Sequence, residues 1–103
     1  MITILNAHSG VRPSDRPGIF WCDRHSPVGN PFRLLDDADR SKVCSQYKVW
    51  FYDIAIKDQK VQEYLETMRQ YLKANGYIYL LCWCVPKQCH VETIAEWLEA
   101  NPL

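Results

Sequence analysis

The pattern that most constrains this chain is a strand, a break and a helix within residues 77–100. Residues 77–84 form an apolar, aromatic-rich run with the length and composition of a buried strand. Pro86 ends the run, because proline cannot extend a strand ladder and pushes its preceding residue away from helical backbone angles. From His90 onward the apolar positions recur with helical period, at Val91, Ile94, Ala95 and Leu98. The pattern therefore places Cys89-His90 at the first turn of a helix that follows a strand, where many open α/β folds bind their ligands.

This turn carries Cys82, Cys84, Cys89 and His90, which allow three interpretations. Cys82 and Cys84 are two residues apart and share one face of the strand, where free cysteines are commonly small core residues. Cys89 is a candidate reactive thiolate, since the unpaired amides and dipole of a helix start favour an anion. The four residues also have ligand types that suit zinc, but their C-x-C-x4-C-H spacing differs from the paired C-x2-C form. Zinc is therefore not favoured, and the cofactor is left open.

Length and composition predict one globular domain over residues 1–103. The 103 residues are 48% hydrophobic and 23% charged, which suits a single core. No apolar run approaches membrane-spanning length, and the first residues lack the features of a signal peptide. Five cysteines without a secretory signal favour a reducing cytoplasmic location over a disulfide framework. The formal net charge of zero does not support general attraction to nucleic acid or membrane.

The order of patterns along the chain is strand, strand, helix, helix, strand, helix. We expect the first two strands at residues 2–6 and 19–22. The first helix follows an acidic segment, with Asp39 or Ser41 as its cap. Its expected apolar stripe, on which Cys44 is most simply a core residue, consists of Val43, Cys44, Tyr47, Trp50, Phe51 and Ile54. Asp58 is the expected cap of the second helix, and Asn75-Gly76 closes it. This order predicts a small single α/β domain with a short, largely parallel sheet of about three strands covered by about three helices.

Arginines gather early in the chain. Arg12, Arg16, Arg24 and Arg33 are four of its six arginines, and the first lysine is Lys42. Arginine suits bidentate contact with phosphate or carboxylate, so this segment is a candidate anion pocket. The alternative for each arginine is a solvated loop residue or an ion pair with a neighbouring aspartate.

Two segments together resemble a known family. Residues 26–32, SPVGNPF, resemble a W-G-N-P-F element with Val28 where tryptophan is usual. Residues 81–90, LCWCVPKQCH, resemble a C-W-C-x-P-x-x-C-H element, although Val91 stands where a glycine usually follows. The chain therefore resembles the phage and bacterial domain-of-unknown-function family 4326. The resemblance implies that the G-N-P-F loop and the C-W-C…C-H turn belong to one unit and form one pocket.

Three classes of function stay open. In the favoured class, the domain binds or processes a phosphate-bearing, nucleotide-like ligand, with Cys89 as nucleophile or anion contact and His90 as acid, base or orienting group. Its other expected ligand-binding residues are Arg24, Gly29, Asn30, Pro31, Phe32, Cys82 and Cys84. The second class is a metal-stabilised module whose cysteines are structural. The third is a phage-type interaction module that docks on a host or partner protein.

Overall fold

The computed structural model describes residues 1–32, 35–83 and 89–103 and has the predicted order of elements. Its strands are β1 (Ile2–Asn6), β2 (Ile19–Trp21) and β3 (Ile78–Cys82). Its helices are α1 (Arg40–Asp53), α2 (Gln59–Asn75) and α3 (Val91–Ala100). The strands form one sheet in the order β1-β3-β2, and both pairings are parallel. The prediction of a small, parallel α/β fold is confirmed.

β3 is the central strand and is covered on both faces. Ile78, Leu80 and Cys82 belong to the main core, whereas Leu81 belongs to a second cluster with Ala7 and Ile19. A parallel strand buried on both faces is apolar almost throughout instead of alternating. This double burial explains the continuous apolar run in the sequence.

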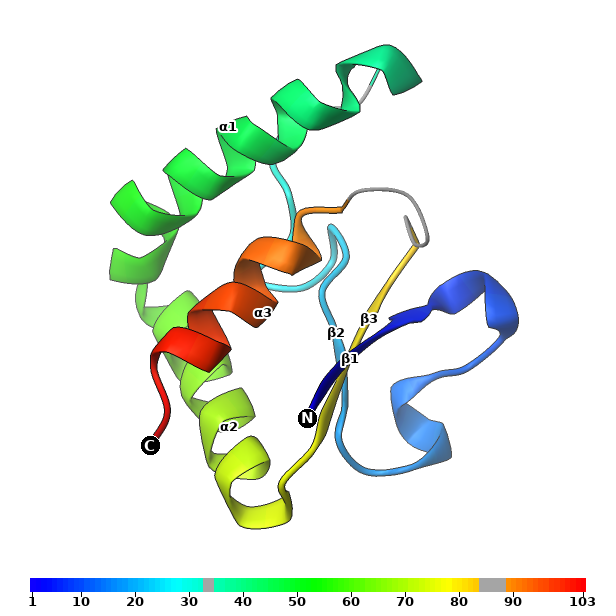
Figure 1. Cartoon of the computed structure of the whole chain (residues 1–103), viewed down its shortest axis with the longest axis vertical. Coiled ribbons are helices and arrows are strands. Elements are labelled where there is room, and N and C mark those ends of the chain that lie inside the picture. The colour runs from blue at the N-terminus through cyan, green and yellow to red at the C-terminus, as the bar shows by residue number, and fades with distance from the viewer. Residues whose placement is uncertain (33–34, 84–88) are drawn as a thin grey trace.

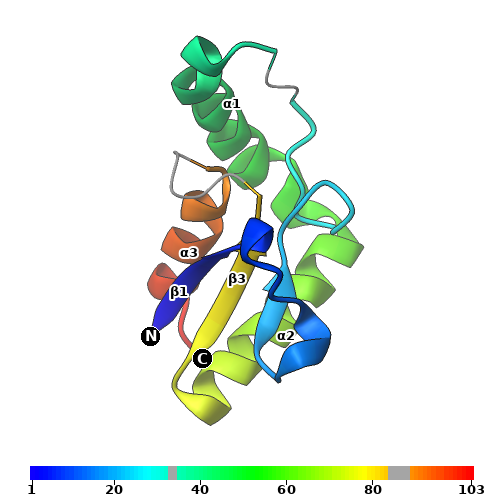
Figure 2. The ribbon, with the colours of Figure 1, turned by 90° about the vertical axis from the view of Figure 1, so that its right-hand side faces the viewer.

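The two faces of the sheet are covered by different parts of the chain. Figures 1 and 2 show α1, α2 and α3 on one side and the segment that joins β1 to β2 on the other. That segment, residues 7–18, contains two short 3-10 turns, Ala7–Ser9 and Pro13–Asp15. The helical side holds the larger core, to which all three helices contribute: Tyr47 and Phe51, Leu65 and Met68, Ile94 and Leu98. No helix within the described residues is long and apolar enough to cross a membrane.

The ends of α2 are as predicted, and the start of α1 is not. Asp58 Oδ1 accepts hydrogen bonds from the amides of Lys60 and Val61, at 2.9 and 3.2 Å. Gly76 ends α2 with a left-handed φ of 76°, a backbone angle that favours glycine. Asp39 occupies the N-cap position of α1 but makes no side-chain cap bond. A 3-10 turn runs directly into this helix, so capping falls to the residue before that turn: Asp36 Oδ1 accepts from the Ala38 amide at 3.0 Å.

Candidate functional site

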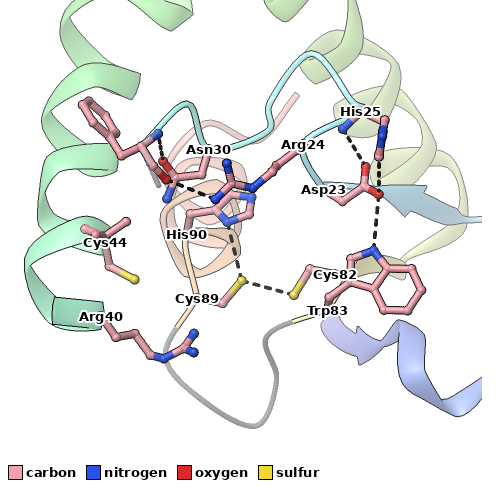
Figure 3. A pocket seen from close by; sticks show the side chains of 12 residues that line it. Asp23, Arg24, His25, Asn30, Arg40, Cys44, Cys82, Trp83, Cys89 and His90 are labelled. Atoms are coloured by element: carbon pink, nitrogen blue, oxygen red, sulfur yellow. Dashed lines mark hydrogen bonds and ion pairs between the residues drawn. The ribbon is translucent and has the colours of Figure 1, made fainter. Parts of the chain in front are cut away.

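A cavity of about 190 Å³ lies beyond the carboxyl ends of β2 and β3 (Figure 3). Its walls come from the loop after β2, the end of β3, the first turns of α1 and the start of α3. Six residues predicted from the sequence line it: Arg24, Asn30, Phe32, Cys82, Cys89 and His90. The G-N-P-F loop and the Cys89-His90 turn are about 60 residues apart in the chain but border the same space. The structure therefore brings the two elements of the resemblance together.

The G-N-P-F loop is held in place by contacts with its own backbone. A Cβ atom on Gly29 would lie 2.4 Å from the Asp23 carbonyl oxygen and 2.6 Å from Arg24 Cα, so only glycine fits without a shift. Asn30 Oδ1 accepts a hydrogen bond from the Phe32 amide at 2.9 Å, which is a turn typical of asparagine. Arg24 Nη2 donates to the Phe32 carbonyl at 3.3 Å. These contacts hold Arg24 and Asn30 at the wall of the cavity.

The loop is also fixed to α1 and, through it, to His90. Val28 is fully buried, and its carbonyl accepts a hydrogen bond of 2.6 Å from the Tyr47 hydroxyl. The Tyr47 ring meets the His90 ring edge-on, with 4.8 Å between centroids. Burial raises the pKa of Tyr47 far above its usual value, and the nearby thiols of Cys22 and Cys89 raise it further. Tyr47 is therefore a neutral donor that joins the loop to the histidine.

The surroundings of His90 define which of its nitrogens carries a proton. His90 Nε2 lies 2.5 Å from the Cys22 carbonyl oxygen, which can only accept a hydrogen bond. In the neutral ring the proton is therefore on Nε2, and Nδ1 keeps its lone pair. Nδ1 lies 3.6 Å from Cys89 Sγ. Cys89 and His90 thus form a thiol–imidazole pair whose orientation is fixed by a backbone carbonyl.

A second thiol adjoins this pair. Cys82 Sγ lies 3.1 Å from Cys89 Sγ, and both residues are buried, with 1% and 2% of their surface exposed. The backbone amide of Cys89 donates to Glu92 Oε2 at 2.8 Å. That amide is therefore occupied by a carboxylate, in contrast to the unpaired amide expected from the sequence. Although only 2% of its surface is exposed, Cys89 borders both this cavity and a second pocket, between α1 and α3.

Cys22 differs from the cavity thiols. It is fully buried, and burial raises the pKa of its thiol far above the usual value, with further increases from Cys82 and Asp23. Its Sγ lies 3.7 Å from the Phe20 carbonyl oxygen. A neutral, enclosed thiol of this kind is a core residue.

The charge around the cavity has both signs. Arg24 and Arg40 line it from opposite segments, together with Asp23 and His25 (Figure 3). The Asp23 carboxylate accepts from Trp83 Nε1 at 3.4 Å and lies 3.4 Å from His25 Nδ1. Arg40 already donates from Nε and Nη2 to Asp37 Oδ1, at 3.1 and 2.7 Å, so Arg24 is the guanidinium that best suits an anion here.

Two of the early arginines are not at the cavity, so the expectation of one arginine-rich anion pocket is wrong for them. The Arg12 guanidinium lies over the Trp21 and Trp83 rings, 5.6 and 5.2 Å from their centroids, and donates to the Ala7 and Val11 carbonyls. Arg16 lies 4.5 Å from the ring centroid of Tyr79, which belongs to the second cluster of the sheet. Aromatic stacking and carbonyl contacts fix these side chains on the face of the sheet opposite the three helices.

The remaining predicted residues have different outcomes. Gly29 supports the loop through close backbone approach instead of lining the cavity, and Pro31 is exposed outside it. Cys84 and Arg33 lie outside the described residues. Within residues 1–32, 35–83 and 89–103, no group of three or more His, Cys, Asp or Glu side chains is arranged to hold a metal ion. The four-ligand interpretation, which the spacing did not favour, includes Cys84 and is untested by the described residues.

Six further lining residues were missed from the sequence: Asp23, His25, Arg40, Val43, Cys44 and Trp83. Cys44 was assigned to the core because it lies on the apolar stripe of α1, yet it is half-buried and faces the cavity. Trp83 lies inside the C-W-C element, which was a usable signal. Arg40 gave none, since only the placement of α1 brings it to the cavity.

Fold and site together define a small parallel α/β domain with a Cys-His turn at the carboxyl ends of its strands. The chain belongs to the family described as Domain of unknown function (DUF4326), whose sequence profile matches residues 8–100. This match confirms the family inferred from the two elements, both of which it spans. Comparison with curated proteins and with solved structures gave no match.

Proposed function

We propose that the cavity binds a small phosphate-bearing, nucleotide-like ligand, on which Cys89 and His90 act. The observation that carries this proposal is the meeting of Arg24 and Asn30 with Cys89 and His90 around one cavity. Cationic, amide and nucleophilic groups from distant parts of the chain converge there, as binding sites require.

The chemistry of the walls favours a ligand with an anionic end and a flat end. Arg24 supplies a guanidinium fork that matches phosphate oxygens, and Arg40, which is paired with Asp37, adds positive charge at the opposite wall. Phe32 supplies aromatic surface for a planar group, whereas the Trp83 ring is already stacked on Trp21 and Arg12. The volume of about 190 Å³ is below the roughly 300–1,000 Å³ of drug-sized pockets, so the ligand is a mononucleotide or smaller.

The Cys89-His90 pair gives this site its reactive group. His90 Nδ1 is positioned to take the proton from Cys89 Sγ, which leaves a thiolate facing the cavity. The Cys22 carbonyl accepts from Nε2 and so stabilises the imidazolium that results.

Thermal unfolding of the full chain with a panel of probes tests the binding. The probes are the common nucleoside monophosphates, their unphosphorylated nucleosides, ribose 5-phosphate and inorganic phosphate. A ligand at 100 times its dissociation constant stabilises a protein by about 2.7 kcal/mol, which raises the melting temperature of a domain this size by about 10 °C or more. We expect at least one phosphorylated probe to do so and its unphosphorylated counterpart to bind at least about tenfold more weakly.

Two arginine variants distinguish binding at the cavity from a nonspecific effect of positive charge. Arg24→Gln should abolish the shift, because Arg24 lines the cavity. Arg16→Gln removes the same charge from the Tyr79 side of the sheet and should leave the shift unchanged. Equal losses in both variants, or no shift with any phosphorylated probe, would refute the proposal.

The interaction-module alternative has one observation in its favour. Val49 and Ile54, on α1 and at its end, are 62% and 60% exposed and border one shallow pocket. Exposed apolar side chains gathered on one surface are typical of docking sites. A Val49→Glu substitution distinguishes the two functions, since it should leave nucleotide binding intact and weaken any protein association through α1.

A further inference from the structure

We infer that Cys82 and Cys89 form a reversible disulfide at the cavity wall when the protein meets a hydroperoxide. This makes the pair a site of oxidative modification, and its formation does not depend on the proposed ligand. Its consequence does: a disulfide removes the Cys89 thiol, so an oxidised protein cannot carry out the thiol chemistry proposed above.

The geometry of the two sulfur atoms is the first support. Cys82 Sγ and Cys89 Sγ are 3.1 Å apart, and a disulfide bond is about 2.05 Å long. Closing this gap takes about 1 Å, which side-chain rotation and small backbone shifts supply. The two residues also end β3 and precede α3, so the bond joins two elements already packed together.

The second support is a base beside Cys89. His90 Nδ1 lies 3.6 Å from Cys89 Sγ, and the bond from Nε2 to the Cys22 carbonyl keeps Nδ1 free of its own proton in the neutral ring. Cys89 is therefore the thiol that reacts with the oxidant. Cys82, on its other side, is the thiol that completes the disulfide (Figure 3).

The third support is access. Both thiols line a cavity of about 190 Å³, which admits a molecule as small as hydrogen peroxide. Cys22 is fully buried, its thiol has a raised pKa, and it does not line this cavity. The thiols open to the oxidant are therefore those that line the cavity, which include the half-buried Cys44, and Cys22 is not among them.

The reaction proceeds in two balanced steps. Cys89 loses its proton to His90, and the thiolate attacks one peroxide oxygen, which breaks the O–O bond and forms a sulfenic acid; the departing hydroxide takes up a proton as water. Cys82 sulfur then attacks the Cys89 sulfur, which breaks the S–O bond; the Cys82 proton leaves with the hydroxyl group as a second water. Two thiols are oxidised and one peroxide is reduced to two waters.

Mass spectrometry of the full chain, treated with hydrogen peroxide near stoichiometry, tests this inference. We expect the intact mass to fall by about 2 Da and to recover with dithiothreitol, because a disulfide replaces two thiol hydrogens. Trypsin cleaves after Lys73 and Lys87, so the bond should join the peptide 74–87 to the peptide 88–103. Fragmentation of the linked pair then decides between Cys82 and Cys84 within the first peptide.

Single substitutions give the matched controls. Cys84→Ser removes a nearby thiol but leaves Cys82 and Cys89 in place. It should form the disulfide at a rate within about twofold of the unmodified chain. Cys82→Ser should instead stop at a Cys89 sulfenic acid that dimedone traps with a mass gain, and the 2 Da loss should slow at least about tenfold. Because peptide mapping of the unmodified chain decides the linkage, the test survives if Cys82→Ser fails to fold.

Three results would overturn the inference. These are a disulfide that links Cys84 to Cys89, a disulfide between different chains, and a chain that keeps all its thiols under the same treatment. A failure of nucleotide binding with normal Cys82–Cys89 oxidation would refute the proposed function alone. Conversely, normal binding without the disulfide would refute this inference alone.

Discussion

Replacing Tyr47 by phenylalanine removes one hydroxyl group whose hydrogen bond holds the G-N-P-F loop to α1. Tyr47 is fully buried, and its hydroxyl donates at 2.6 Å to the carbonyl of Val28, which is also fully buried. The ring itself stays and keeps its contacts with Phe51 and His90. The substitution therefore tests the hydrogen bond apart from the packing.

The expected cost follows from the burial of both partners. A buried carbonyl that loses its donor costs about 1–3 kcal/mol, more than the roughly 0.5–1.5 kcal/mol of an average hydrogen bond. For a domain of this length, that cost lowers the melting temperature by about 5–20 °C. Because Val28 precedes Gly29 and Asn30, we also expect weaker ligand binding at the cavity.

Chemical denaturation followed by tryptophan fluorescence measures this cost, with Tyr52→Phe as the matched control. Tyr52 lies on the same helix but is 38% exposed, so its loss of a hydroxyl should change the free energy of unfolding by less than about 0.5 kcal/mol. If Tyr47→Phe is as stable as Tyr52→Phe, the loop is not held by this bond and the reasoning fails.

Four further outcomes are expected. Gly29→Ala should destabilise the chain by about 1–3 kcal/mol, because its Cβ would meet backbone atoms. The control in the same denaturation assay is Gly10→Ala, whose added Cβ has nothing within 4 Å and is opposed only by the φ of 92°. Equal losses of stability in the two variants would contradict the clash at Gly29. The free energy of unfolding should fall as pH rises above about 8.5, because the Cys22 thiol ionises there in the unfolded chain while burial keeps it neutral in the folded one. Cys22→Ala should therefore lose less stability than the unmodified chain between about pH 8.5 and 10. The same pH dependence in both proteins would count against a raised pKa for Cys22. Native alkylation with a small reagent should label Cys89 before Cys22, since Cys89 lines the cavity and Cys22 does not. Labelling of Cys89 only after unfolding would make it a packing residue. Elemental analysis of protein prepared without chelator should find less than one zinc per chain, and one tightly held zinc lost together with folding would support the metal-stabilised module instead.

Local patterns were sufficient for the elements of this fold. The continuous apolar run that contains β3, the capping aspartate Asp58 and the glycine Gly76 each act through neighbouring backbone, so their effects can be seen in the sequence. The start of α1 was less clear, because a 3-10 turn and a helix use the same acidic residues. Ile54 was also wrongly included in the apolar stripe of that helix, since it follows the last turn and is exposed.

The candidate site was predicted only where a motif carried it. Gly29, Asn30, Cys89 and His90 belong to the two elements of the family resemblance, which allowed their meeting to be expected before the fold was known. Arg24 was expected at the site with this loop, whereas no pattern in the sequence indicated that Arg12 stacks on Trp21 and Trp83.

The sequence by itself determined the order of the elements, the parallel α/β class and the family, because periodicity, capping and motif spacing are local properties. Only the tertiary structure decided that Arg40 and Cys44 face the cavity, that Arg12 stacks on tryptophans instead, and that Cys82 lies beside Cys89. These facts depend on how β3 is inserted between β1 and β2 and how the helices then pack on one face. Such contacts join residues far apart in the chain, and no local pattern encodes which side chains a shared core will bring within bonding distance.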